Sequence, residues 1–208
     1  MDSLEKTVNS LLPQVNFLFV ALNGHKEVPK FLCNKPRISY ALLDNKMADC
    51  AKFHSIDERV GYIFTCDDDI IYPHTYCQDM IDGINKYKCI VTLHGKVYPR
   101  PIKSFYNIEK NYRCLGNVPK GGYVDVGGSG VMAWHTDFFK LRHDDCKTPN
   151  MADICVSRIA KYYGVKIMVL PHTENYLQHI RYKDNLFVRE HKKGFSEQTR
   201  MLKEIFNA

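Results

Sequence analysis

Three consecutive aspartates are the strongest candidates for chemistry in this sequence. Asp67, Asp68 and Asp69 directly follow the apolar run 61–66, and the apolar pair Ile70–Ile71 comes next. Adjacent carboxylates repel one another and are costly to bury without compensation. They could form an acidic surface turn, although turn aspartates usually come with Gly or Asn. We favour a site for a hard divalent cation, Mg²⁺ or Mn²⁺, bridging the diphosphate oxygens of a nucleotide.

A fourth carboxylate, Asp153, opens a segment with helical periodicity, because apolar residues recur along it at Val156, Ile159, Ala160 and Tyr163. A carboxylate in the first turn of a helix can cap free backbone N–H groups. It could instead be a general base that takes the proton from an attacking hydroxyl group. The sequence leaves both roles open.

A glycine-dense segment, Gly127-Gly-Ser-Gly130, lies between the apolar runs 123–126 and 131–134. Such glycines allow a close approach to a ligand, or else they form a β-bulge or tight turn. The segment is not a P-loop, because no Lys-Ser/Thr pair follows it. For Trp134, the only tryptophan, we expect packing in the core rather than stacking on an acceptor.

Alternating apolar runs and helical patterns predict the elements that position these residues. Pro13 should end the first helix. We expect helices over 3–12, 46–56, 74–86 and from Ser196, and strands over 15–22, 38–43, 61–66, 89–93 and 165–170. This rhythm predicts an α/β fold with a mixed, mainly parallel central sheet flanked by helices. Ligands then bind at the carboxyl ends of the strands. Residues 98–122, rich in Pro and Gly, should form a long excursion.

Composition is ordinary for a globular protein and argues against disorder, with 45% hydrophobic and 25% charged residues in 208. The eight cysteines lack a Cys-x-x-Cys spacing, so we expect reduced thiols in the cytoplasm rather than a zinc site. Neither a signal peptide nor an apolar stretch of about 18 residues is visible, so we expect no membrane span. The basic segment 181–203 could meet an anion or form a solvated helix face, and we expect no nucleic-acid partner.

Several stretches in the same order resemble GT-A fold glycosyltransferases, specifically a capsule-type subset of the family-2-like members. An apolar strand followed by Asp-x-Asp resembles their DxD motif. The other similar stretches are Leu4–Gln14 (the first helix), Asp49-Cys-Ala-Lys-Phe53, His94-Gly95, Gly127-Gly-Ser-Gly-Val131 and Met151-Ala-Asp-Ile154. The resemblance covers nearly the whole chain. It extends to glycosyltransferase domains in multidomain proteins of large chlorella-type viruses.

The resemblance implies one GT-A domain over 1–208, with a nucleotide-binding half at about 1–95 and a sugar and acceptor half at about 96–208. It implies a Mn²⁺- or Mg²⁺-dependent hexosyltransferase that uses a UDP-hexose or UDP-deoxyhexose and a glycan hydroxyl acceptor. If the protein is viral, the host cytoplasm is the expected location. Relatives begin with a strand before the first helix. Either this strand is lost or the numbering starts inside a longer chain with further domains.

The resemblance also implies roles for particular residues. Asp69 would bind the metal directly, and Asp67 would reach the metal through water or bind the ribose. His191, chosen over His172 and His179, would complete the metal shell. The residues around the donor would be Asp49, Lys52, Asp67, Asp68, Gly128, Ser129 and Lys192, with Asp125 as a further candidate, and Asp153 would be the general base. For Lys52 and for the 191–194 segment, the alternative is an exposed basic surface.

Two other functions fit parts of this pattern. A Mg²⁺-dependent nucleotidyltransferase would need a glycine-rich phosphate loop at the first strand, which the sequence lacks. A nucleotide-sugar-binding module without catalysis would not need both the acidic cluster and Asp153. Calorimetry with UDP, GDP and a UDP-sugar, with and without Mn²⁺, is the most informative single experiment on these alternatives.

Overall fold

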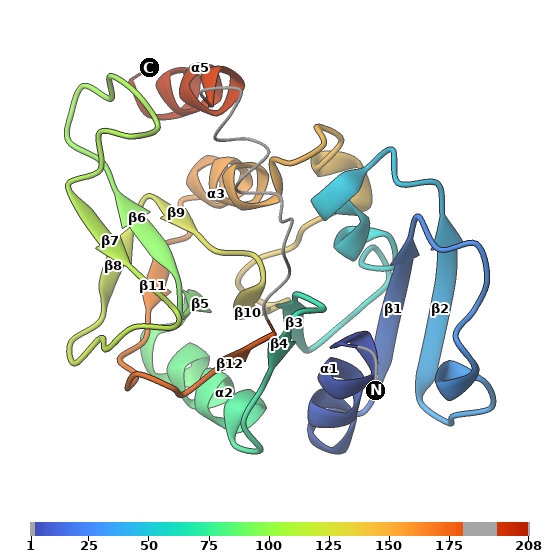
Figure 1. Cartoon of the computed structure of the whole chain (residues 1–208). Helices are drawn as coiled ribbons and strands as arrows, with labels where there is room; N and C mark the ends of the chain where they lie inside the picture. The colour runs from blue at the N-terminus through green and yellow to red at the C-terminus, as the bar shows by residue number, and fades with distance from the viewer. Residues whose placement is uncertain (1–2, 181–194, 208) are drawn as a thin grey trace.

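A five-stranded mixed sheet lies at the centre of the computed structural model, which describes residues 3–180 and 195–207 (Figure 1). Its strands, in spatial order, are β3 (Tyr62–Cys66), β10 (Val131–His135), β5 (Ile90–Thr92), β11 (Ile167–Val169) and β8 (Gly122–Val124). The prediction of an α/β fold with a mixed sheet is confirmed. β3, β5 and β11 run in one direction, and β10 and β8 run in the other.

The prediction of a mainly parallel sheet is wrong when neighbouring strands are compared. Within the described residues, parallel pairing joins β5 to β11 and joins β1 (Leu18–Asn23) to β2 (Ile38–Leu43), and the other strand pairs are antiparallel. The reason is that β10 lies between β3 and β5, so both of its neighbours run against it. This insertion brings the start of β10 to the edge where β3 ends.

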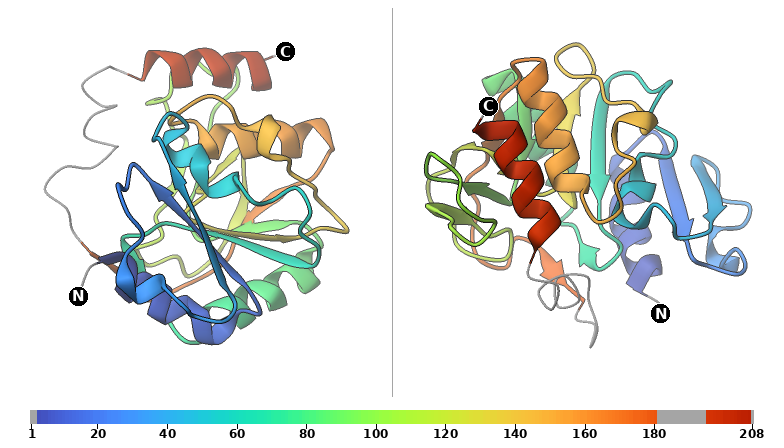
Figure 2. Two further views of the ribbon diagram at one scale, coloured as in Figure 1. Left: turned by 90° about the vertical axis from the view of Figure 1, so that its right-hand side faces the viewer. Right: turned by 90° about the horizontal axis from the view of Figure 1, so that it is seen from above.

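Helices cover both faces of the sheet, with α2 (Tyr76–Tyr87) on one face and α3 (Ala152–Tyr162) and α5 (Ser196–Phe206) on the other (Figures 1 and 2). Side chains of β10 alternate between the two faces, as a strand requires. Met132 and Trp134 belong to the core beneath α3 and α5, and Val131 and Ala133 belong to the core beneath α2. Trp134 packs edge-on against Phe139, which confirms its predicted core position.

The two-stranded sheet of β1 and β2 lies beside β3 in Figure 1 and packs against α1 (Ser3–Leu11). Leu4 and Val8 of α1 share a buried cluster with Val20 and Leu22 of β1. These apolar residues recur at helical spacing in α1 and at every second position in β1, so local periodicity explains the contact.

Short elements connect these layers: η1 (Leu12–Gln14), η2 (Lys30–Leu32), η3 (Ala48–Phe53), η4 (His143–Asp145), β4 (Ile70–Ile71), β6 (Gly95–Val97), β7 (Lys110–Tyr112), β9 (Val126–Gly127) and β12 (Gln178–His179). The helix predicted over 46–56 is the 3₁₀ helix η3, and it follows Met47 and begins with a left-handed Ala48 (φ 45°). The predicted excursion over 98–122 contains β7, which pairs with β6.

All eight cysteines are free thiols, and most are buried among apolar side chains. In the part of the chain that the structure describes, no helix is long and apolar enough to cross a membrane.

Candidate active site

The acidic cluster and the glycine loop meet at the carboxyl end of β3. β10 begins with Val131 opposite Cys66, which places Gly130 beside Asp67. A Cβ atom at Gly130 would lie only 1.9 Å from Oδ2 of Asp67. Glycine is therefore required here by the close approach of a carboxylate, and not by a special backbone angle.

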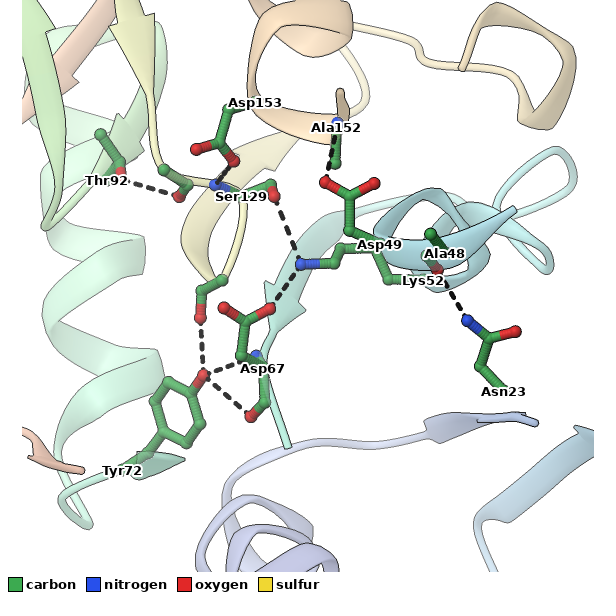
Figure 3. A network of polar contacts seen from close by, with 12 residues as sticks. Asn23, Ala48, Asp49, Lys52, Asp67, Tyr72, Thr92, Ser129, Ala152 and Asp153 are labelled. Carbon is green, nitrogen blue, oxygen red and sulfur yellow. Dashed lines mark hydrogen bonds and ion pairs between the residues drawn. The ribbon is translucent and has the colours of Figure 1, made fainter. Parts of the chain in front are cut away.

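A salt bridge joins the acidic cluster to η3. The Lys52 Nζ lies 2.5 Å from Asp67 Oδ1 and 3.3 Å from Ser129 Oγ (Figure 3). Burial opposes the positive charge, but the pKa of the Lys52 ammonium is raised because the carboxylates of Asp67, Asp49 and Asp153 outweigh it. Lys52 is thus a charged residue of the site, and the alternative of an exposed lysine is excluded because its side chain is only 15% exposed.

Buried hydrogen bonds hold the backbone of this region in one conformation. The Tyr72 hydroxyl donates to the carbonyl of Gly130 at 2.6 Å and accepts from the N–H of Asp67 at 2.9 Å. Thr92 Oγ1 donates to the carbonyl of Gly128 at 3.1 Å. On the other side, Thr7 of α1 donates to the carbonyl of Ile70 at 2.7 Å. The acidic residues and the glycine loop are therefore held by Thr7 of α1, Thr92 of β5 and Tyr72, which follows β4.

Asp153 does not cap its own helix. Its Oδ1 accepts the N–H of Ser129 at 2.7 Å, which ties the start of α3 to the glycine loop (Figure 3). The N–H of Ala152 is instead accepted by Asp49 Oδ2 at 3.0 Å. Asp49 therefore takes the capping role that the sequence left open for Asp153, and Asp153 remains available at the site.

Asp49 is a residue of η3, and its side chain reaches the start of α3. Its Oδ1 is buried, and no residue in the ranges 3–180 and 195–207 forms a hydrogen bond with it. Burial raises the pKa of Asp49 to about 6, although Lys52 and the N–H of Ala152 oppose this shift. The side chain of Asn23 fixes η3 from below by donating to the carbonyl of Ala48 at 2.8 Å.

Asp69 pairs with a histidine from a distant part of the chain. β12 pairs with β4 so that His179 lies opposite Ile70, and His179 Nε2 is 3.1 Å from Asp69 Oδ2. Burial and the charge of Asp67 raise the pKa of Asp69, and His179 opposes this shift. Burial and the charges of Asp69 and Asp67 likewise raise the pKa of Asp68. The three carboxylates are thus crowded and incompletely neutralised.

This donor set fits Mn²⁺ or Mg²⁺ in its chemistry. Asp67 and Asp69 supply carboxylate oxygens, and His179 could supply a nitrogen. Among the residues that the structure describes, no three acidic, histidine or cysteine side chains converge as a complete metal cage. A complete cage is not required, because Mg²⁺ is commonly bound by one or two carboxylates together with water and substrate phosphates.

The remaining predicted residues lie in other surroundings. Asp125 is paired with Arg100 at 2.6 Å and accepts the N–H of Tyr98, so it holds a loop and has little freedom to contact a donor. His172 is buried, and its two ring nitrogens contact the carbonyls of Leu170 and Arg113. The other two predicted residues, His191 and Lys192, lie outside the described residues.

Sequence reasoning missed the role of Tyr72 and the contact of His179 with Asp69, and its choice of His191 as a metal ligand stays a prediction. Tyr72 lies five residues after Asp67 and returns to it through the Ile70–Ile71 strand. The signal for His179 was weak, because the contact depends on pairing of two-residue strands more than 100 positions apart.

A scan against protein-family models finds no match, and a search of curated proteins finds no relative of this chain.

Proposed function

We propose that this protein is a glycosyltransferase that moves a hexose or deoxyhexose from a UDP-sugar to a glycan hydroxyl group with the help of Mn²⁺ or Mg²⁺. The observation that carries this proposal is the arrangement of Asp67, Asp69 and Asp153 at one edge of the sheet. Two carboxylates that suit a cation lie beside a third that is fixed by Ser129 and is linked to the first through Lys52.

In this proposal Asp153 is the general base. Its Oδ1 is occupied by the N–H of Ser129, and no described residue donates a hydrogen bond to its Oδ2. The acceptor hydroxyl oxygen forms a bond to the anomeric carbon as its proton passes to Asp153. The bond from that carbon to the phosphate oxygen breaks, and UDP leaves. This direct displacement inverts the anomeric configuration.

The remaining residues bind and orient. A divalent cation at Asp67 and Asp69 would stabilise the negative charge on the departing diphosphate. Lys52 holds Asp67 toward the loop and adds positive charge on the same side. The Gly127–Gly130 backbone, fixed by Thr92 and Tyr72, suits close contact with the donor sugar because it lacks bulky side chains. Eight free thiols support a reducing compartment, and we propose the cytoplasm.

The experiment is calorimetric titration of UDP with and without Mn²⁺ on the wild type and on Asp69→Ala. We expect tight binding only with Mn²⁺ and only in the wild type. The thermal midpoint should barely move, because removing one of three crowded carboxylates relieves repulsion that raises the pKa of Asp69. Asp82→Ala on the surface of α2 is the matched control. Equal UDP affinity in wild type and Asp69→Ala would refute the metal site.

A further inference from the structure

Lys96 is a charged residue that neither the acidic cluster nor the proposed chemistry uses. It lies in the middle of β6, opposite Val126 of β9, just before the glycine loop. A Cβ atom at Gly95 would contact Val124 and Val169, and Val97 packs in the same cluster. Because side chains alternate along a strand, Lys96 points to the opposite face. That face carries α3, which begins with Ala152 and Asp153.

The ammonium of Lys96 lies over an aromatic wall. Its Nζ is 4.0 Å from the centroid of the Phe105 ring. Phe105 stacks on Phe195 at the start of α5, with 4.6 Å between ring centroids, and Tyr106 contacts the same phenylalanine edge-on. Half of the Tyr106 side chain is exposed. Aromatic faces beside a cation suit a sugar, which offers both C–H faces and polar groups.

The ammonium of Lys96 is not neutralised by any carboxylate in the described part of the chain. Among the residues that the structure describes, no carboxylate lies within ion-pair distance of its Nζ. Burial lowers the pKa of the Lys96 ammonium, and the charge of Asp153 opposes this shift. The cation is thus partly desolvated, and its contact with the Phe105 ring compensates only part of the cost. An anion on a ligand would complete its surroundings.

We propose that Lys96 binds a carboxylate of the acceptor sugar, so that the acceptor is an acidic glycan such as a uronic-acid-containing one; this inference rests on the proposed function. An acceptor must place a hydroxyl group at Asp153, and Lys96 lies opposite Val126, which packs in one core cluster with Ala152 at the start of the same helix. Lys52 on η3 already provides a positive charge on the side of the site where the donor is proposed to bind. β6 and η3 lie on opposite sides of the glycine loop in Figure 1, so the two lysines serve different ends of the site.

The test compares two probes that differ only at one carbon: methyl β-glucuronoside, which carries a carboxylate, and methyl β-glucoside, which carries a hydroxymethyl group. Binding is measured by protein-observed NMR titration of the full chain in the presence of UDP and Mg²⁺. The variants are Lys96→Met, Lys96→Gln and Lys96→Arg. Lys110→Met is the matched control, because Lys110 also lies over a ring, that of Tyr112, on the neighbouring strand.

We expect the wild type to prefer the glucuronoside by about tenfold, as one charge-assisted hydrogen bond provides. Lys96→Met and Lys96→Gln should lose the preference, whereas Lys96→Arg and Lys110→Met should keep it, and UDP affinity should stay constant. Equal binding of both probes by the wild type, or a preference that survives in Lys96→Met, would overturn the assignment. A loss of UDP affinity in Lys96→Met would also overturn the assignment, because Lys96 would then bind the donor nucleotide instead of the acceptor. If the wild type does not bind UDP but still prefers the glucuronoside, the proposed function is refuted and the assignment of Lys96 to a carboxylate is kept.

Discussion

The carboxylate of Asp153 both fixes a loop and carries the chemistry in the proposed reaction. One oxygen accepts the N–H of Ser129, and the other is the atom that would take a proton. Asp49, in contrast, is a structural carboxylate that lies behind the site and caps α3. Substitution by asparagine separates these roles, because asparagine keeps a hydrogen-bond acceptor and loses the charge.

For Asp153→Asn we expect the transfer rate to fall about 10²- to 10⁴-fold, which is the usual contribution of a general base. The amide oxygen can still accept the N–H of Ser129, so the glycine loop and the UDP affinity should be unchanged. The measurement is sugar transfer, or slow donor hydrolysis, beside UDP calorimetry on one preparation. Transfer at nearly the wild-type rate would show that Asp153 is not the base.

For Asp49→Asn we predict greater stability than the wild type at pH 7. The folded pKa of about 6 lies above the ordinary value of 3.8, so the folded state binds the proton more tightly. The free energy of unfolding of the wild type therefore falls as pH rises from about 4 to about 6, by roughly 2–3 kcal/mol. Asparagine caps α3 equally well and does not ionise.

Urea denaturation of both proteins at pH 4 and pH 7 checks this prediction. The gap between them should be small at pH 4 and reach its full size at pH 7. If the wild type is more stable than Asp49→Asn at pH 7, the folded protein stabilises the ionised form of Asp49, and the prediction is wrong. UDP titration of the same variant tests the separate prediction that Asp49 binds the donor, since a purely structural Asp49 leaves that affinity unchanged.

At the scale of elements, the site depends on β10 entering the sheet between β3 and β5. This insertion delivers the Gly127–Gly130 loop to the acidic cluster, and it explains why glycine is needed at position 130. Gly130 has no left-handed φ, so alanine is compatible with its backbone. The obstacle is the Asp67 side chain, whose Oδ2 and Cγ would lie 1.9 and 2.3 Å from the new Cβ.

Gly130→Ala should therefore displace the Asp67 carboxylate from Lys52 without unfolding the protein. Asp67 is 45% exposed and can turn toward solvent, so we expect a stability change within about 1 kcal/mol. Mn²⁺-dependent UDP affinity should drop at least tenfold, measured by calorimetry. Gly116→Ala is the control, because its Cβ would lie no closer than 3.4 Å to another atom. If Gly130→Ala binds UDP with the wild-type affinity, the Asp67 carboxylate does not contribute to donor binding.

Local sequence patterns predicted those elements whose signals are local. The apolar run before Asp67 forms β3, and the apolar stripe after Asp153 forms α3. The order of strands could not be predicted, because β10 pairs with residues 65 to 73 positions away in β3 and 40 to 42 positions away in β5. Strands of two or three residues, such as β4 and β12, carry too few side chains for a periodic signal. For this reason a metal role for Asp69 could be predicted from the sequence, whereas its contact with His179 could not.

At the scale of the whole molecule, α5 packs with α3 and holds the loop that carries Ile102 and Phe105. Leu202 of α5 is fully buried in the core shared with α3. Asn207 accepts the N–H of Ile102 at 2.8 Å and donates to its carbonyl at 3.0 Å. Thr199 accepts the N–H of Phe105 at 3.0 Å. Figure 2 shows α5 lying along α3 next to this loop. The C-terminal helix thus holds the ring over which Lys96 lies.

The double variant Thr199→Val, Asn207→Ala removes these side-chain contacts and leaves the buried face of α5 intact. Amide exchange at Ile102 and Phe105 should accelerate about 10- to 100-fold, because each lost hydrogen bond contributes about 1 kcal/mol to local stability.

UDP affinity should not change, since the acidic cluster lies at the end of β3 and has no contact with this loop. Preference for the glucuronoside should weaken, because the Phe105 ring no longer holds the Lys96 ammonium in place. Arg200→Ala is the control, because the partners that the structure describes for Arg200 are Glu197 and Glu204 on the exposed side of the helix. Unchanged exchange in the double variant would mean that stacking of Phe105 on Phe195 suffices to hold the loop, and α5 would then act through its apolar face alone.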